Sequence, residues 1–410
     1  MLRQLPCVIF FALVPLLPAH GKADTELHVS LMLSSGEQRT FFNQAARHFE
    51  RRHSDVSIQV HVFSDRQYKQ NLHTWLEQER FDVMYWHAGE RLFELVREGH
   101  VAAIDNLWKD NRWDEAFPDA ICHLVNHEQN YYAVPYSYYP WGIYYNRKLF
   151  RRLELEPPET WEDFLMLGDT LRAHGITPLS AGTLDYWPAA AWFDLISLRL
   201  HGPEFHRALL RGEVAYTDER VKQVLAHWAE LIERDFFTSG HENRSWKNAL
   251  PLLYRDIAGM MLIGNFAAYE IPERIRQNFS LFSFPVIDSK QPRTELTPTD
   301  VFFLPSHAAD NELAQKFLSY MAEPQIQQLL NNESGMLPPH RHAVPGIGLL
   351  LEESQKLIDQ AETTTQYFDR DTVPAMAERA IRIFQDFMRE PDIDETARAL
   401  EKTRQRVFEN

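Results

Sequence analysis

The sequence is poor in cysteine and in basic charge, and both shortages limit what the protein can be. It has 2 cysteines in 410 residues, Cys7 and Cys122. Since Cys7 lies in an N-terminal run that we expect to be removed, the mature chain keeps one thiol, which cannot form an internal disulfide. Lys and Arg number 42 against 58 Asp and Glu, a net charge of −16. An acidic chain does not neutralise phosphates, so neither nucleic acid nor anionic lipid is an expected partner.

Long apolar runs are absent from the sequence after its N-terminal segment. That segment contains one apolar run, which prolines interrupt. Residues 1–23 combine the positive Arg3, the apolar stretch Leu5–Leu17 and small residues up to Ala23. This pattern predicts a secretory signal peptide cleaved near Ala23. The apolar stretch is too short for a membrane span, which needs about 20 apolar residues. Cleavage would remove Arg3 and Lys22 and change the net charge from −16 to −18. We therefore expect export to the periplasm.

The mature chain has the composition of a folded protein of two units. Hydrophobic residues make up 44% and charged residues 24% of the sequence, and 410 residues are typical of two domains. No repeat or Gly/Ser linker separates two halves, which favours two lobes that the chain visits more than once. Strands are expected at 26–33, 56–63 and 81–86, alternating with helices at 37–53, 68–78 and 90–98. This alternation predicts an α/β fold with helix-covered sheets.

The second half is expected to contain more helix. An aromatic, strand-rich segment covers 131–146, and Thr160 with Asp163 forms a helix N-cap signal. The remaining expected elements are helices at 161–175, 189–200, 218–234 and 249–254, strands at 257–264 and 279–287, a strand–helix unit after 301, and an amphipathic helical tail from 374.

Four segments, residues 81–105, 132–150, 155–182 and 301–338, carry a resemblance to a known family. They contain a strand that ends in an aromatic, a Tyr-Asn-Arg crossover, a Pro-x-Thr-Trp helix start and a Gly-x-Leu-Pro loop. Together and in order, they resemble the periplasmic solute-binding proteins of ABC importers, specifically the family 1 extracellular sugar-binding type that includes maltodextrin-binding protein.

The resemblance implies the two-lobed periplasmic-binding-protein fold of type II. Each lobe would be a mostly parallel sheet flanked by helices, with hinge crossovers near Tyr136–Tyr139, Ile287 and Glu323. The N-terminal lobe would comprise residues 24–137 plus 288–323, and the C-terminal lobe residues 138–287 plus 324–410. A ligand would lie in the cleft between them, at the carboxyl ends of strands.

A sugar presents apolar ring faces and a rim of hydroxyl groups, so its site needs flat aromatic rings and planar polar groups. The expected aromatic platforms are Trp86, Tyr139, Trp187 and Phe266. The expected hydroxyl partners are Glu37, Glu90, Arg91, Asn265 and Asp300. By resemblance, Trp86, Glu90 and Arg91 take the place of the family's aromatic, carboxylate and arginine after this strand. The family's late aromatic is absent, and Met376 lies in that stretch.

Several residues have competing interpretations. Trp161 and Trp228 lie in helical patterns and are expected in the core, whereas Trp141 and Trp192 fit either core or ligand. Glu37 and Glu90 also fit as helix N-terminal charges.

No cofactor and no metal are expected. His123 and His127 lie beside Cys122 but lack further ligands at metal spacing. No nucleophile elbow or phosphate loop occurs.

The leading hypothesis is therefore a monomeric periplasmic binding protein that captures a carbohydrate and delivers it to the transmembrane permease subunits of an ABC importer, without catalysis. An alternative is a ligand sensor that docks on a chemoreceptor or sensor histidine kinase. A secreted carbohydrate-active enzyme is a third hypothesis, which has no catalytic signature in its favour.

Overall fold

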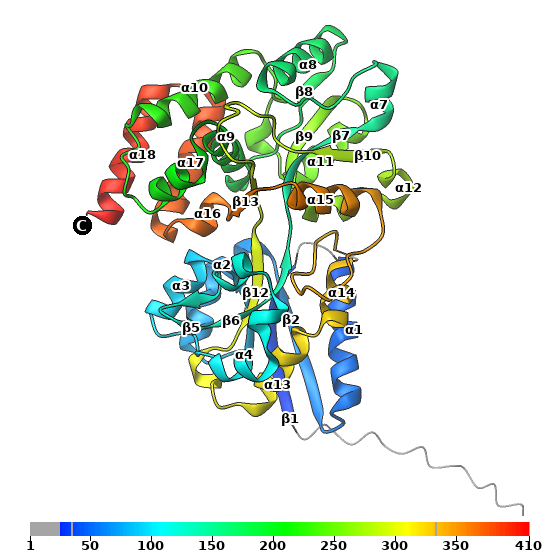
Figure 1. Ribbon diagram of the computed structural model, residues 1–410, viewed down its shortest axis with the longest axis vertical. Helices are drawn as coiled ribbons and strands as arrows, with labels where there is room; N and C mark the ends of the chain where they lie inside the picture. Colours follow the sequence, from blue (N-terminus) through cyan, green and yellow to red (C-terminus); the bar gives the residue numbers. More distant parts are fainter. Residues whose placement is uncertain (1–24, 34–35, 333, 410) are drawn as a thin grey trace, which may run out of the picture.

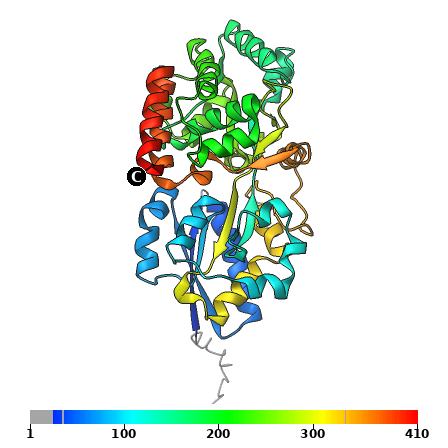
Figure 2. The same ribbon diagram turned by 60° about the vertical axis from the view of Figure 1, so that its left-hand side comes forward.

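The computed structural model describes residues 25–33, 36–332 and 334–409. These residues form two lobes, one above the other in Figure 1 and Figure 2. Each lobe has its own hydrophobic core, one built from segments between Leu27 and Leu330 and the other from segments between Tyr139 and Leu400. The predicted signal peptide and its cleavage site near Ala23 lie outside the described residues.

The N-terminal lobe is built on a five-stranded sheet of order β2-β1-β3-β12-β6. Its strands are β1 (Thr25–Met32), β2 (Val56–Phe63), β3 (Val83–His87), β6 (Ala133–Tyr138) and β12 (Thr299–Phe303). β12 runs antiparallel to both of its neighbours, while β1 pairs in parallel with β2 and β3. All residues of β3 and β12 are buried, as expected for central strands with helices on both faces.

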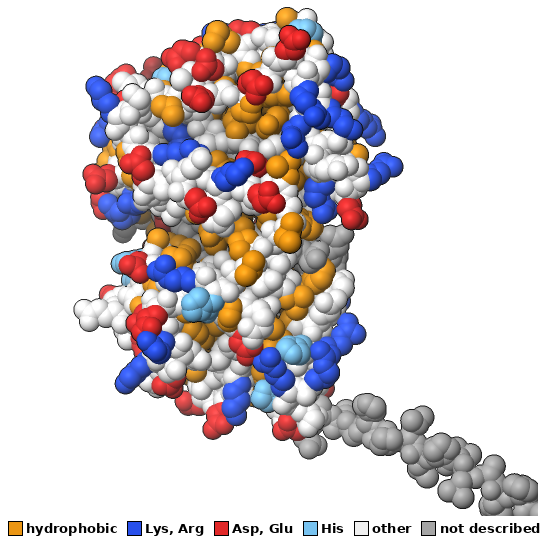
Figure 3. Space-filling view, turned by 45° about the vertical axis from the view of Figure 1, so that its right-hand side comes forward, with side chains coloured by type: hydrophobic (Ala, Val, Ile, Leu, Met, Phe, Trp, Pro, Cys, Tyr) orange, Lys and Arg blue, Asp and Glu red, His pale blue; other side chains and the backbone are white. Residues whose placement is uncertain are grey.

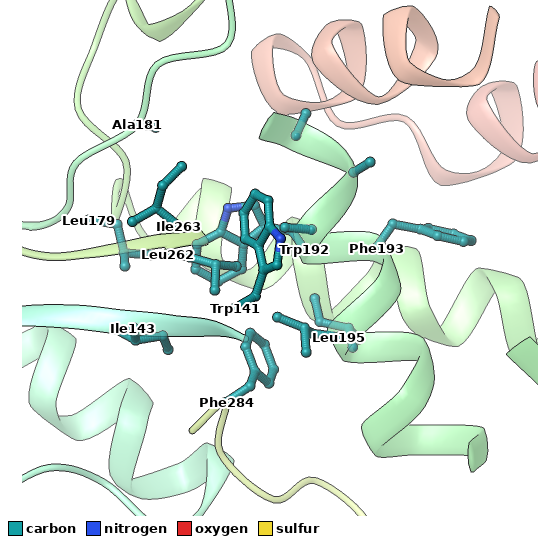
Figure 4. Close-up of a cluster of buried hydrophobic side chains, with 14 of the residues drawn as sticks. Trp141, Ile143, Leu179, Ala181, Trp192, Phe193, Leu195, Leu262, Ile263 and Phe284 are labelled. Carbon is teal, nitrogen blue, oxygen red and sulfur yellow. The ribbon is translucent and has the colours of Figure 1, made fainter. Parts of the chain in front are cut away.

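The C-terminal lobe is built on a four-stranded sheet of order β10-β7-β9-β8. Its strands are β7 (Trp141–Asn146), β8 (Thr177–Leu179), β9 (Ala258–Gly264) and β10 (Phe279–Phe282). β7 runs antiparallel to its neighbours, so in each of these two larger sheets all strands but one share one direction. Figure 4 shows Trp141 and Ile263 of this sheet packed near Trp192 and Leu195.

Helices cover both sheets where the sequence predicts them. Thr160 caps α8, since its hydroxyl accepts from the Asp163 N–H at 3.2 Å and the Asp163 carboxylate accepts from the Thr160 N–H at 3.3 Å. The longer helices are α1 (Gly36–Arg52), α2 (Asp65–Glu77), α3 (Glu90–Arg97), α8 (Trp161–Ala173), α9 (Ala190–Leu210), α10 (Glu219–Glu233), α11 (Trp246–Tyr254), α13 (Glu312–Met321), α14 (Pro324–Asn332), α15 (Leu349–Asp359), α17 (Pro374–Arg389) and α18 (Ile393–Phe408). No helix of the described residues is both long and apolar enough to cross a bilayer.

Short elements complete the two lobes. The helices are α4 (Asp105–Asn111), α5 (Trp113–Ala116), α6 (Asp119–Cys122), α7 (Arg147–Arg152), α12 (Glu273–Arg276) and α16 (Phe368–Asp371), and the 3-10 turns are η1 (Trp187–Ala189), η2 (His241–Asn243), η3 (Asn265–Glu270) and η4 (Ser306–Ala308). The short strands are β4 (Asn126–His127), β5 (Asn130–Tyr131), β11 (Thr294–Leu296) and β13 (Thr363–Thr365).

The chain crosses between the cores in three places. The first crossing joins β6 to β7, close to the expected hinge. The second lies between β11 and β12, because Leu296 packs in the C-terminal core. The third follows α14, whose Ile326 and Leu330 pack in the N-terminal core. The second crossing lies after Leu296 and the third after Leu330, whereas the expected boundaries are at 287/288 and 323/324, since apolar patterning does not reveal which core a residue joins.

Candidate ligand-binding site between the lobes

One arginine of the C-terminal lobe joins strand ends of both lobes. Arg370 lies in α16, and its guanidinium donates to the Asp300 carboxylate at 2.7 Å and to the Thr299 carbonyl at 3.3 Å, both at the start of β12. It also donates to the Tyr139 hydroxyl at 2.8 Å, in the crossing between β6 and β7. All these side chains are buried. Burial raises the pKa of Asp300, and the neighbouring Arg370 charge opposes that shift.

A second set of contacts between the lobes involves Asp369, the residue before Arg370. The Lys69 ammonium of α2 lies 3.4 Å from the Asp369 carboxylate, and Arg91 Nε of α3 donates to the Asp369 carbonyl at 2.6 Å. Burial would raise the pKa of Asp369, but the charges of Lys69, Arg91 and Arg370 outweigh it and hold that pKa below its ordinary value. We call the region around Asp300, Asp369 and Arg370, where the lobes meet, the junction. It therefore holds the Asp369 carboxylate among three cations, Lys69, Arg91 and Arg370.

His87 is a polar group of this junction that lacks a hydrogen-bond partner among the described residues. It ends β3 opposite Asp300 of β12, and its side chain is 2% exposed. Neither ring nitrogen has a hydrogen-bond partner among the described residues. Burial lowers the pKa of His87 well below its ordinary value, with smaller contributions from Arg370, Lys69 and Arg91. The imidazole is therefore neutral, with one donor and one acceptor to offer.

Aromatic rings from four separate segments gather on the C-terminal side. Trp141 of β7 stacks on Tyr367 with ring centroids 4.7 Å apart, and the Trp187 ring meets Trp141 edge-on at 6.0 Å. Phe266 of η3 lies edge-on to Tyr139 at 5.3 Å and to Trp187 at 6.0 Å. Trp187 and Phe266 are half-buried, whereas the other three are buried. These two rings are therefore the more exposed members of the group.

The structure places the expected site residues at different depths. Tyr139, Asp300 and Arg91 lie in the charged junction, and Trp187 and Phe266 lie in the aromatic group. Trp86 is buried beneath them: it stacks on His87 at 5.0 Å and on Tyr68 at 5.8 Å, and its indole N–H donates to the Arg91 carbonyl.

Three expected hydroxyl partners fare differently. Asn265 is fully buried; its amide oxygen accepts from the Tyr144 hydroxyl and its amide nitrogen donates to the Gly335 carbonyl, so both ends of the amide have protein partners. Glu90 is the first residue of α3 and pairs with Arg97, which agrees with its alternative interpretation as a helix N-terminal charge. Glu37 is the second residue of α1, and its side chain lies outside the described part.

The sequence interpretation missed five residues of the junction. They are Lys69, His87, Tyr367, Asp369 and Arg370. Met376 lies in α17, where no late aromatic was expected. An aromatic ring comes instead from Tyr367, which precedes α17 and stacks on Trp141. A signal was available: residues 367–371 place two aromatics and three charges together immediately before an amphipathic helix.

The two tryptophans expected in the core are there: Trp161 is 4% and Trp228 0% exposed. Trp141 and Trp192 are also buried.

The chain is similar in sequence to known proteins. The family model of the bacterial extracellular solute-binding proteins matches residues 34–328. An uncharacterised ABC transporter extracellular-binding protein of Pyrococcus horikoshii is 24% identical over 336 residues, 80% of this chain and 74% of that protein. A probable sugar-binding periplasmic protein of Mesorhizobium japonicum is 22% identical over 258 residues, 61% of this chain and 60% of that protein.

Solved structures match over nearly the whole chain. The bacterial solute receptor AcbH, described as having an exclusive preference for β-D-galactopyranose, aligns with a TM-score of 0.88 at 26% identity, over 94% of this chain and 100% of that one. A chitin oligosaccharide binding protein aligns with a TM-score of 0.84 at 16% identity, over 93% of this chain and 98% of that one. The fold is thus the two-lobed type II fold, and the protein belongs to the family of bacterial extracellular solute-binding proteins.

Proposed function

We propose that the protein is the periplasmic substrate-binding component of an ABC importer and that it binds a carbohydrate at the junction between its lobes. The observation that carries the proposal is His87, a buried imidazole without a partner among the described residues, opposite Asp300. A buried polar group without a hydrogen bond costs about 1–3 kcal/mol. A sugar hydroxyl, which donates and accepts, would satisfy either ring nitrogen.

The aromatic group supports the same ligand class. The half-buried rings of Trp187 and Phe266 would face the apolar side of a sugar ring, while Asp300, Arg370 and Asp369 would face its hydroxyls. The preference of AcbH for β-D-galactopyranose makes galactose the first candidate. The ligand set proposed for this chain is His87, Arg91, Tyr139, Trp187, Phe266, Asp300, Asp369 and Arg370, while Trp86 supports His87 from below the site.

Binding would act by a shift of population between open and closed lobes. Contacts such as Lys69 with Asp369 and Arg370 with Asp300 exist only when the lobes meet, so a ligand held by both lobes stabilises the closed state. The permease subunits would recognise that state. The chain would act as a monomer and make or break no bond, which fits a receptor family rather than an enzyme.

Isothermal titration calorimetry of the mature chain with D-galactose, raffinose and chitin oligosaccharides tests the proposal. We expect saturable binding of at least one sugar. His87→Phe keeps the ring and removes both nitrogens, so it should weaken that binding about tenfold to hundredfold.

His174→Asn, at an exposed histidine after α8 in the other lobe, is the matched control and should bind as the wild type does. Absence of binding for every sugar in the panel would reject the carbohydrate assignment. Unchanged affinity in His87→Phe would reject the role of His87.

A further inference from the structure

A second group of ligand-type side chains lies on the N-terminal lobe, apart from the junction. It consists of His73 in α2, and Glu98 and His100 directly after α3. One atom from each, an imidazole nitrogen or a carboxylate oxygen, lies within 4.8 Å of the other two. Figure 1 shows α2 and α3 together on one side of the lower lobe.

The backbone holds two of these residues in place. Gly99 has a φ of +78°, a left-handed conformation that glycine adopts without steric cost. This turn lets the His100 N–H donate to the Leu95 carbonyl at 2.9 Å, and so returns His100 alongside Glu98. Ser306 fixes the turn from the neighbouring segment, since its N–H donates to the His100 carbonyl at 2.9 Å and its hydroxyl to the Gly99 carbonyl at 2.6 Å.

The spacing of the three groups suits a small divalent ion. His73 Nδ1 lies 3.5 Å and His100 Nε2 lies 3.8 Å from Glu98 Oε2. Zinc bonds to imidazole nitrogen and carboxylate oxygen measure about 2.0–2.2 Å, which places neighbouring ligands of a tetrahedral site about 3.4 Å apart. The ligand atoms of His73 and His100 lie within 4.8 Å of each other, so side-chain movements of up to about 1.4 Å would bring all three groups to tetrahedral spacing.

We propose that His73, Glu98 and His100 bind a Zn²⁺ ion, with a water molecule as the fourth ligand. Two imidazoles and one carboxylate form a donor set typical of zinc, whereas Ca²⁺ and Mg²⁺ prefer oxygen ligands alone. The side chains are 51%, 41% and 29% exposed, so the ion can enter from solvent. No sequence pattern predicts this site, because His73 and the pair Glu98 and His100 come from two separate segments.

The ion would tie α2 to α3. Lys69 lies one helical turn before His73, and Arg91 lies near the start of α3; both contact Asp369 across the lobes. Zinc would therefore stabilise the pair of helices that carries these two cations. The site does not depend on the proposed ligand or transporter.

A second histidine pair provides the matched control. His28 Nδ1 lies 3.1 Å from His61 Nε2, and Glu26 approaches the other nitrogen of His28 at 4.0 Å. These three residues do not converge on one point, so we expect no comparable site there.

The test is a titration of the untagged mature chain, freed of metal with a chelator, with Zn²⁺ by calorimetry and with Co²⁺ by visible absorption. We expect one ion per chain, the intense absorption of tetrahedral cobalt, and a higher melting temperature with zinc. His73→Asn and His100→Asn should each weaken binding at least about tenfold, the loss seen when even the outer partners of metal ligands are changed. His61→Asn should bind as the wild type does.

Two results would overturn the proposal. One is no saturable zinc binding by the wild-type chain, which would leave the cluster as an ion-paired surface. The other is binding that His61→Asn abolishes and His73→Asn leaves unchanged. Because His73 is exposed, its variant should fold, and circular dichroism checks this.

Discussion

Arg370→Met tests whether the two lobes are held by a buried ion pair. The wild-type guanidinium serves Asp300, the Thr299 carbonyl and Tyr139, with the Arg370 and Asp300 side chains 9% and 6% exposed. Methionine keeps most of the length and removes the charge, which leaves the Asp300 carboxylate buried without its cation. Removal of one partner of a buried pair costs about 3–5 kcal/mol, mainly because the other charge stays uncompensated.

Urea unfolding at neutral pH measures this loss. The control is Arg112→Met, which breaks a pair with Glu115 whose side chains are 72% and 61% exposed, and which should leave the free energy of unfolding close to the wild-type value because solvent screens the pair. The double variant Asp300→Asn/Arg370→Met removes both charges and should be more stable than Arg370→Met alone. The reasoning is refuted if Arg370→Met loses less than about 1 kcal/mol, or if the double variant loses the sum of both single changes.

Three further predictions follow from the junction. Burial raises the pKa of Asp371 to about 6, so between about pH 4 and 6 the folded state holds a proton that the unfolded state has released, and stability falls as pH rises through that window. Asp371→Asn should therefore be up to about 3 kcal/mol more stable than the wild type at neutral pH and gain nothing in acid. Unfolding at several pH values would contradict this if the difference in stability did not vary with pH. Gly89→Ala should lower the free energy of unfolding by about 1–3 kcal/mol, because alanine is strained at a φ of +78° and a ψ of −144°. The control Gly175→Ala, in an open turn, should cost about 1 kcal/mol. Equal losses of the two variants in thermal or urea unfolding would be evidence against this backbone strain at Gly89. Trp187→Ala should weaken sugar binding, measured by calorimetry, about tenfold or more. The melting temperature should change little, since this ring is half-buried. Unchanged affinity would remove Trp187 from the ligand set.

Local elements were largely predictable from the sequence. The strand patterns at 26–33 and 56–63 became β1 and β2, because alternating apolar residues fit one buried face. The capping box of Thr160 and Asp163 starts α8 where expected, since those contacts are made within four residues. Acidic and basic side chains are intermingled over both lobes on the face in Figure 3, as a chain with many charges of both signs allows.

The candidate site was only partly predictable. Tyr139 and Asp300 were expected and lie together, whereas Arg370, which joins them, was not expected. It is separated from Asp300 by 70 positions, and no short-range pattern encodes such a pairing. Asn265 was expected to face a ligand, but Tyr144 and Gly335 use its amide.

The sequence by itself therefore determined the α/β alternation, the helix starts and the family, since these depend on periodicity, capping and ordered motifs. Tertiary structure alone decided which polar groups are satisfied and which, like His87, have no hydrogen-bond partner among the described residues. It also brought His73 next to Glu98 and His100. The physical reason is that hydrogen bonds and ion pairs depend on distances of a few ångströms between residues far apart in the chain, and the folding of both lobes sets these distances.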